Sequence, residues 1–333
     1  MSDFAVFLSG GPFMLCSLSR RSVLAALAAS GLVSGLSVRR ARGQGAPASP
    51  AAERGNAQPA EVIDHPRARS FEIGPTDAPW RIFLGLPEGD PPARGWSLVL
   101  STDGNATFPM LWHHRERTAP GAPVLLASIG YPGERRFDTV RRRFDLTSPG
   151  MVPVGGLAEG QRGPGRDPTG GREALLDLIE HRLLDEIAAR APVDREDMTL
   201  FGHSLGGHFT MHAFYSRTWL FRRFSAADPS GWWNSGEIEL EERAFRAGVR
   251  AAGGRLARAT VLMVTGSAGR LPAEGEAPRE LVAPPWIERL AGIEGLEIGW
   301  KGYPGESHGS LLGPAARRTL DLHLGRIAGP GAP

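Results

Sequence analysis

The chain has 333 residues, 41% of them hydrophobic and 22% charged, which is the composition of an ordinary globular protein with a sizeable core. Its formal net charge is +2, but residues 1–43 contain five arginines and one acid, so the remainder is net negative. This charge balance argues against a general nucleic-acid-binding role, which requires a basic surface.

Residues 1–43 have the pattern of a twin-arginine export signal. Arg20 and Arg21 stand before an apolar run that is rich in Ala, Gly and Ser, and Ala41-Arg42-Gly43 is a small-x-small cleavage site. The run is too short and too weakly apolar to form a membrane helix. We therefore expect the twin-arginine machinery to export the protein to the periplasm, where the signal is cleaved.

Two details of the export signal affect the mature protein. Met14 lies close before the arginine pair, so either Met1 or Met14 is the start of the chain. The single cysteine, Cys16, falls inside the signal. The mature protein is therefore expected to contain no disulfide and no thiol chemistry.

The remaining sequence divides into a linker and one domain. Residues 44–66 are rich in Ala, Pro, Gly and Gln and predict a flexible linker, and residues 67–330 predict a single domain. Short apolar runs within the domain predict strands at 70–73, 80–84, 96–100, 124–129, 198–201, 224–227, 260–265 and 296–303.

Helices are predicted between the later strands. Apolar residues at three- and four-residue spacing indicate a helix from about 175 to 187, and further helices are expected at 205–215, 237–251, 285–290 and 310–325. Residues 150–171, rich in Gly, Pro and Arg, predict a long loop. Strands that alternate with helices imply one doubly wound, mostly parallel sheet with helices on both faces. Ligands of such a sheet bind beyond the carboxyl ends of its strands.

One of these strand ends carries a pattern with catalytic meaning. Gly202-His203-Ser204-Leu205-Gly206 follows a short apolar strand and precedes a helix, which is the Gly-x-Ser-x-Gly nucleophile turn of the α/β-hydrolase fold. The strained turn exposes the serine hydroxyl, and its glycines let helix and strand approach closely. Ser204 is therefore the expected nucleophile.

A serine nucleophile needs a base and an oxyanion hole. His308 follows the last predicted strand, where an α/β-hydrolase keeps its catalytic histidine, and is the expected base. The backbone amide of Leu205 is one expected oxyanion donor. The second is the amide of Asn105, in the Asp-Gly-Asn loop after the strand at 96–100.

The acid that would orient His308 stays open at this point. The loop after Thr265 should carry it, yet residues 266–270 contain no carboxylate. The candidates are Asp228, Glu274, Glu276 and Glu306, and a Ser-His pair without an acid is a further alternative.

The other histidines give no metal site. His208 and His212 are one helical turn apart, but the glutamate of the zinc-protease motif is missing between them. Neither a metal nor another cofactor is expected.

Six elements together resemble a known family. They are the Asp-Gly-Asn loop, Gly130-Tyr131-Pro132, Arg143-Phe144-Asp145-Leu146-Thr147-Ser148-Pro149, the serine turn, Pro229-Ser230-Gly231-Trp232-Trp233-Asn234 and Glu306-Ser307-His308-Gly309-Ser310. In this order they resemble the Putative esterase family of esterase D type, within it the periplasmic siderophore trilactone esterases that hydrolyse enterobactin and salmochelin. The resemblance covers about residues 70–325.

This resemblance implies an α/β-hydrolase fold in which Ser204 is the nucleophile, His308 the base and the Asp-Gly-Asn loop part of the oxyanion hole. Some relatives work with a Ser-His pair alone. The chain departs from the family at Asp228, where relatives have a small residue, and after Thr265, where their glutamate is missing. The orientation of His308 therefore stays open.

The fold by itself does not identify the substrate, because one fold hosts many ester specificities. Catecholate siderophores are anionic and aromatic. Arg143 could contact the negative charge of such a siderophore, and Trp232 and Trp233 could stack on its aromatic rings. Arg143 belongs to a cluster with Arg135, Arg136, Arg141 and Arg142. The alternatives are a general carboxylesterase for small or aromatic-acid esters, with solvated arginines and core tryptophans, and a non-catalytic periplasmic siderophore-binding protein. The sequence does not fix the oligomeric state.

Overall fold

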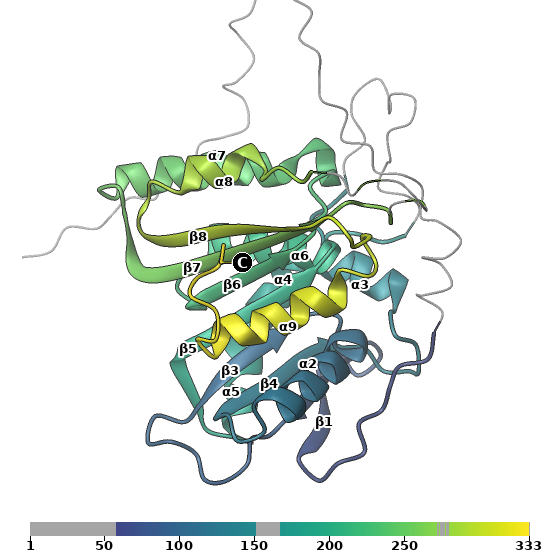
Figure 1. Cartoon of the computed structure of the whole chain (residues 1–333). Coiled ribbons are helices and arrows are strands. Elements are labelled where there is room, and N and C mark those ends of the chain that lie inside the picture. The colour runs from purple at the N-terminus through teal and green to yellow at the C-terminus, as the bar shows by residue number, and fades with distance from the viewer. Residues whose placement is uncertain (1–57, 151–166, 272, 274–276, 278–279, 333) are drawn as a thin grey trace, which may run out of the picture. The chain divides into compact units, whose positions relative to one another are not determined.

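The computed structural model describes residues 58–150, 167–271, 273, 277 and 280–332 (Figure 1). Eight strands form one sheet in the order β1-β2-β4-β3-β5-β6-β7-β8. The strands are β1 (Ala68–Ile73), β2 (Trp80–Gly85), β3 (Trp96–Ser101), β4 (Val124–Gly130), β5 (Val193–His203), β6 (Arg223–Ala227), β7 (Arg255–Ser267) and β8 (Glu294–Tyr303). The pairs β1-β2 and β2-β4 are antiparallel, and every later pair is parallel. The expected doubly wound, mostly parallel sheet is confirmed.

Helices cover both faces of the sheet. They are α2 (Gly104–Thr118), α3 (Thr139–Asp145), α4 (Arg172–Leu178), α5 (Leu184–Ala188), α6 (Leu205–Ser216), α7 (Glu237–Ala251), α8 (Pro285–Leu290) and α9 (Leu312–His323). A π-helical turn, Ile179–Leu183, joins α4 to α5, and a 3-10 turn, Trp233–Ser235, precedes α7. The helices α2 and α9 pack side by side against one apolar cluster of the sheet, and α4 to α8 supply the other (Figure 1).

Two helices were not predicted, α2 and α3. Helix α2 contains Pro109, and its residues from Gly104 to Pro109 are all buried. A stretch of helix that is buried on all sides, as the first half of α2 is, shows no apolar stripe of period 3.6, and an internal proline argues against a helix in sequence. The Asp-Gly-Asn segment therefore not only forms a turn but also begins helix α2.

Residues 58–66, which the composition assigns to the linker, contact the domain. Pro59 forms a bridge with Arg135, the amide of Ala60 donates to the carbonyl of Glu134, and Ile63 packs on the apolar cluster under α2. The described domain thus begins before residue 67. The predicted export signal and residues 44–57 lie outside the described residues. No helix in the described part of the chain is long and apolar enough to cross a bilayer.

The parallel strands bring distant residues to one edge of the sheet. The carboxyl ends of β3, β5, β6, β7 and β8 all point the same way, because these strands are parallel neighbours. The segments that follow them contain Asp103, Ser204, Asp228 and His308, and Ser267 is the last residue of β7. The candidate site lies at this edge.

Candidate active site

Ser204 lies on a strained turn between β5 and α6. Its backbone has φ 61° and ψ −118°, a conformation that costs a non-glycine residue about 1–3 kcal/mol. The amide of Ser204 donates to the carbonyl of Ala227 at 2.9 Å, which fixes the turn to β6. A Cβ on Gly202 would lie 2.1 Å from the carbonyl oxygen of Gly206, and one on Gly206 would lie 2.3 Å from Thr102 Oγ1. Both glycines are therefore required by close packing.

His308 contacts the serine hydroxyl from the loop after β8. Its Nε2 lies 2.9 Å from Ser204 Oγ, and its ring is about half exposed. The structure thus brings together the two residues that the sequence predicted as nucleophile and base. Ser230 Oγ lies 3.4 Å from Ser204 Oγ on the other side, so a second hydroxyl borders the site.

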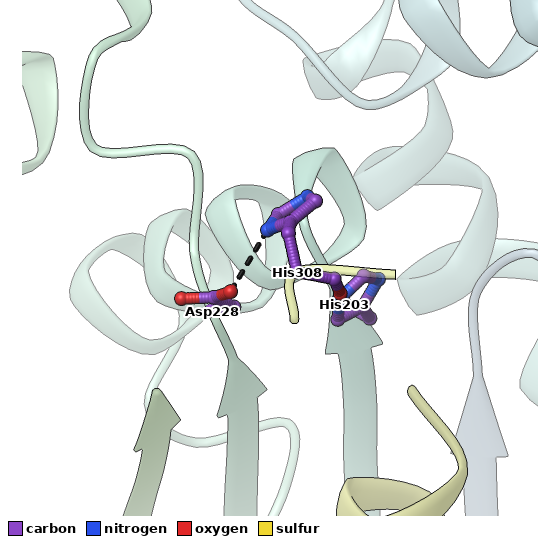
Figure 2. A group of neighbouring side chains, drawn as sticks. All are labelled: His203, Asp228 and His308. Carbon is purple, nitrogen blue, oxygen red and sulfur yellow. Dashed lines mark hydrogen bonds and ion pairs between the residues drawn. The ribbon is translucent and has the colours of Figure 1, made fainter. Parts of the chain in front are cut away.

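Asp228 completes the chain of contacts from the end of β6. Its Oδ2 lies 2.8 Å from His308 Nδ1 (Figure 2). The same oxygen accepts a hydrogen bond from Ser267 Oγ at 2.5 Å. A carboxylate only accepts, so Nδ1 carries the proton and Nε2 is free to accept from Ser204. Among the acids left open by the sequence, Asp228 is the one the structure places against His308.

The other candidate acids have different positions. Glu306 accepts from Ser310 Oγ and belongs to the turn that carries His308. Glu274 and Glu276 lie outside the described residues. The carboxyl end of β7, next to the loop predicted to carry the acid, contributes the hydroxyl of Ser267 to the site.

Electrostatics hold Asp228 in its charged form. Burial alone would raise the pKa of this carboxyl, but the hydrogen bond and charge of His308 and the hydroxyl of Ser267 together bring its pKa below the ordinary value. Asp228 is thus an anion at neutral pH, and an anion beside Nδ1 stabilises a positive charge on the imidazole.

His203 lies directly beneath His308. Its Nε2 donates to the backbone carbonyl of His308 at 2.8 Å, and the two ring centroids are 4.8 Å apart (Figure 2). The ring is buried, and burial, with the charges of His308 and Arg142, lowers the pKa of His203 to about 3. No local sequence pattern indicates this contact, because it joins residues that are 105 positions apart.

The Asp-Gly-Asn loop lies against the start of α6. Asp103, with φ 55°, precedes α2, and its carboxylate would lie 3.4 Å from a Cβ on Gly206. The side chain of Asn105 is bonded to both backbone groups of Tyr131, at 2.8 and 3.0 Å. The first amides of a helix lack partners within the helix, and Asn105 and Leu205 are in the first turns of α2 and α6.

The arginine cluster is largely occupied within the protein. Arg142 forms a two-pronged ion pair with Asp103 at 2.7 and 2.9 Å, which fixes the Asp-Gly-Asn loop. Arg141 donates to the carbonyl of Ala78 and lies 3.6 Å from Asp145. The guanidinium of Arg143 lies over the ring of Trp233 at 5.4 Å. Three of its five arginines, Arg141, Arg142 and Arg143, thus have partners within the protein.

The two tryptophans have different environments. Trp232 is 40% exposed, whereas Trp233 is 1% exposed and its Nε1 donates to Ser148 Oγ at 2.9 Å. Asn234 Nδ2 also contacts that hydroxyl, at 2.8 Å. Contrary to the stacking role considered from the sequence, Trp233 has no ring face open to a ligand, and it holds the Arg-x-Asp-Leu-Thr-Ser element against the Trp-Trp-Asn element.

His208 and His212 belong to a buried ionic network that links α4, α6 and α7. His212 lies 2.6 Å from Glu173 and 2.9 Å from Glu241, and burial is outweighed by these carboxylates, which raise its pKa. His208 Nε2 lies 3.4 Å from Glu237, which also pairs with Arg172 at 3.1 Å. Arginine within the network makes it a poor cation site.

In the described part of the chain, one group has ligand atoms close enough for a metal ion. It consists of His203, Asp228 and His308, whose ligand atoms lie within 4.8 Å of one another. His308 Nδ1 and Asp228 Oδ2 are bonded to each other, and His203 Nε2 is bonded to a carbonyl. The arrangement matches acyl-transfer chemistry better, because Nε2 of His308 faces a hydroxyl.

Comparisons with known proteins find similarity to esterases. The family model described as Putative esterase matches residues 151–282. The siderophore enterobactin esterase of Emericella nidulans is 29% identical over 273 residues, which cover 73% of this chain and 88% of that protein. The siderophore triacetylfusarinine C esterase of Aspergillus fumigatus is 34% identical over 155 residues, 44% of this chain. The chain spans about half the length of that second relative, 49%.

A solved structure extends the likeness to the fold. The siderophore hydrolase EstA from Aspergillus nidulans superposes with a TM-score of 0.62 at 25% identity, covering 80% of this chain and 98% of the other. The α/β-hydrolase fold is thus confirmed, and so is the expected resemblance to the Putative esterases and their siderophore-hydrolysing members.

Proposed function

Because this chain is similar to the Putative esterases, siderophore esterases among them, we propose that it is a hydrolase of carboxylic esters with Ser204 as its nucleophile. The observation that carries the proposal is the continuous contact Asp228–His308–Ser204, at 2.8 and 2.9 Å. A serine hydroxyl is a poor nucleophile at neutral pH, and a base held by a carboxylate is the usual way to activate it.

The geometry suggests the following acylation step. Ser204 Oγ attacks the ester carbonyl carbon while His308 Nε2 takes the hydroxyl proton. The proton on Nδ1 stays with His308, and the Asp228 anion stabilises the imidazolium. The C–O bond to the alcohol then breaks, the alcohol oxygen takes the proton from Nε2, and an acyl-enzyme on Ser204 remains.

Deacylation reverses these roles with water. His308 Nε2 takes a proton from a water molecule, whose oxygen attacks the acyl carbon. The bond to Ser204 Oγ breaks, the serine regains a proton from His308, and the carboxylic acid leaves. Apart from the ester and water, both steps use only side chains and backbone amides of this protein, and neither step requires a cofactor.

The developing oxyanion needs preorganised donors, and we assign the backbone amides of Leu205 and Asn105. Both belong to the first turns of helices, whose N-terminal ends favour negative charge. The support for Asn105 is that its side chain is already engaged with Tyr131, which rigidifies the loop that presents its amide.

For the substrate, the relatives' names favour a siderophore ester, and a general carboxylic ester is the second candidate. Trp232 offers an exposed ring near the site that could stack on an aromatic group, and Arg143 lies behind it over Trp233. The internal pairing of Arg141 and Arg142 weakens the case for a strongly anionic ligand, which keeps the general esterase in consideration.

Hydrolysis of p-nitrophenyl butyrate tests the enzymatic proposal. Wild-type protein should turn over the ester, and Ser204→Ala should lower kcat at least a thousandfold. The matched control is Ser307→Ala, which changes a partly buried serine of the His308 loop that contacts Ser310 rather than Ser204. If wild type and Ser204→Ala are equally inactive on short and aromatic esters but bind a siderophore, the protein is a binding protein instead.

The substrate class requires a second measurement. Ferric and iron-free enterobactin are incubated separately with the enzyme, and linear trimer is sought by mass spectrometry. Cleavage of either form that depends on Ser204 supports the siderophore proposal. Intact enterobactin beside rapid cleavage of aryl esters would assign the protein to the general carboxylesterases.

Export remains a separate proposal that rests on Arg20, Arg21 and the apolar run that follows them. A fusion of residues 1–50 to a reporter should reach the periplasm in cells with an intact twin-arginine machinery and stay inside cells that lack it. A reporter that stays inside both strains would refute periplasmic localisation.

A further inference from the structure

His203 joins the strand of the nucleophile to the loop of the base. It is the last residue of β5, directly before Ser204, and its Nε2 donates to the carbonyl of His308 at 2.8 Å. Figure 2 shows its ring below the backbone of His308, at the end of a strand adjacent to the one that leads to Asp228. One partly buried hydrogen bond therefore connects β5, which leads to Ser204, with the loop that carries His308. These two segments must meet for proton transfer.

Two further backbone hydrogen bonds hold the His308 loop against the segment after β7. The amide of His308 donates to the carbonyl of Gly269 at 3.2 Å, and the amide of Ala268 donates to the carbonyl of Glu306 at 3.0 Å. These contacts fix the loop to the segment after β7, two strands away from Ser204. They set the distance from His308 to Ser267 and Asp228, but they do not set its distance to the nucleophile.

We propose that His203 is a positioning residue that holds the base His308 in register with Ser204 through the carbonyl of His308. The inference rests on the proposed function. A misplacement of about 1 Å between reacting groups can cost a hundredfold in rate, so a contact that fixes this register has a measurable effect.

The residue in this position must donate a hydrogen bond and stay uncharged. The rings of His203 and His308 are 4.8 Å apart, so a second positive charge would oppose the imidazolium that forms on His308 during catalysis. The charged groups that face His203 are Asp228, His308 and Arg142. Burial and the charges of His308 and Arg142 outweigh the opposing effect of Asp228 and lower the pKa of His203 to about 3. A buried neutral histidine meets both requirements, whereas lysine or arginine meets only the first.

Two amide substitutions separate the hydrogen bond from packing. His203→Gln places its amide nitrogen near the position of Nε2, and His203→Asn carries the same amide on a side chain one carbon shorter, near the position of Nδ1. Both are uncharged, so they differ mainly in reach toward the carbonyl of His308. The readouts are kcat and KM for p-nitrophenyl butyrate, the pH dependence of kcat/KM, and Tm.

We expect His203→Asn to lower kcat by about 10- to 100-fold with KM changed less than about threefold, and His203→Gln to recover most of the loss. The acid limb of kcat/KM should stay in place in both variants, because the contacts with the segment after β7 keep His308 against Asp228. A role in folding alone would lower Tm in both variants and give them equal kcat values.

The outcomes are distinguishable. Equal kcat values for the Gln and Asn variants, or an acid limb that moves in His203→Asn, would overturn the positioning role of His203 while leaving Ser204-dependent hydrolysis intact. Wild-type turnover that survives Ser204→Ala would instead refute the proposed function, and the inference would be rejected with it.

Discussion

A hydrogen bond from Ser267 Oγ to Asp228 Oδ2, at 2.5 Å, links the carboxyl ends of the neighbouring strands β6 and β7. The acid thus comes from the end of β6, and the end of β7 contributes a hydroxyl that supports it. His308 Nδ1 contacts the same carboxylate oxygen at 2.8 Å. The carboxylate that orients the base is therefore held from two sides.

Asp228→Asn should lower kcat by about a hundred- to ten-thousandfold at neutral pH. The amide can neither stabilise the imidazolium nor enforce the tautomer that leaves Nε2 free for Ser204. Ser267→Ala removes the supporting hydrogen bond to Asp228 and the one that Ser267 Oγ accepts from the amide of Gly269 at 3.1 Å, but it leaves the carboxylate in contact with His308, so we expect a loss of about tenfold or less. Steady-state rates on p-nitrophenyl butyrate give both values. Wild-type kcat in Asp228→Asn would mean that a Ser-His pair suffices.

These positions also show what sequence could and could not predict. Alternating strands and helices, the serine turn and the late His308 are local patterns, and they predicted the sheet and two interacting side chains. Asp228 was one of several candidate acids, because its contact with His308 depends on which strand ends lie next to each other. Trp232 and Trp233 are adjacent in sequence, so no local pattern distinguishes the exposed ring from the buried one. His203 likewise acts through a contact that folding alone creates.

Two glycine-to-alanine substitutions should have opposite effects on stability. A Cβ at Gly206 would lie 2.3 Å from Thr102 Oγ1, next to the nucleophile turn, so Gly206→Ala must displace β3 or α6. We expect a lower Tm and at least a tenfold loss of kcat. Gly248→Ala is the matched control, because nothing lies within 4 Å of a Cβ there and the site is within α7. It should stabilise the protein by about 0.5–1 kcal/mol. Equal effects on Tm would contradict the close packing at Gly206.

The two tryptophans should separate binding from stability. Trp233→Phe removes the buried hydrogen bond to Ser148, and we expect Tm to fall by several degrees. Trp232→Ala removes an exposed ring, so Tm should stay nearly constant while KM for an aromatic-acid ester rises about threefold or more. Thermal unfolding and steady-state kinetics on aliphatic and aromatic esters measure both. Unchanged KM for every aromatic ester in Trp232→Ala would exclude a stacking role.

Stability should fall as the pH drops from about 6.5 toward 4, partly because of His323. Its nitrogens contact Thr199 Oγ1 at 2.8 Å and Ser97 Oγ at 2.9 Å, and burial lowers its pKa to about 4. The unfolded histidine, with an ordinary pKa, binds a proton in this window that the folded one does not, so acid favours unfolding. By linkage the contribution is about 2 kcal/mol at pH 5.

Urea unfolding at pH 7 and pH 5 measures this effect. Burial lowers the pKa of His203 as well, so the stability that wild type loses between pH 7 and pH 5 includes contributions from both histidines. The contribution of His323 is the loss measured for wild type minus the loss measured for His323→Gln. That variant should be less stable at pH 7 and should lose less stability between the two pH values. An equal loss in wild type and variant would show that His323 is not protonated on unfolding in this range.

The most direct test of the central claim is the site of covalent modification by a fluorophosphonate ester, determined by intact-mass and peptide mass spectrometry. The account predicts one adduct per chain, on Ser204, formed much more slowly in Asp228→Asn and not formed in Ser204→Ala. It also predicts that esterase activity is lost in proportion to the modified fraction. Full activity after modification, or an adduct on Ser230 or Ser307 in its place, would contradict the assignment of Ser204 as the nucleophile.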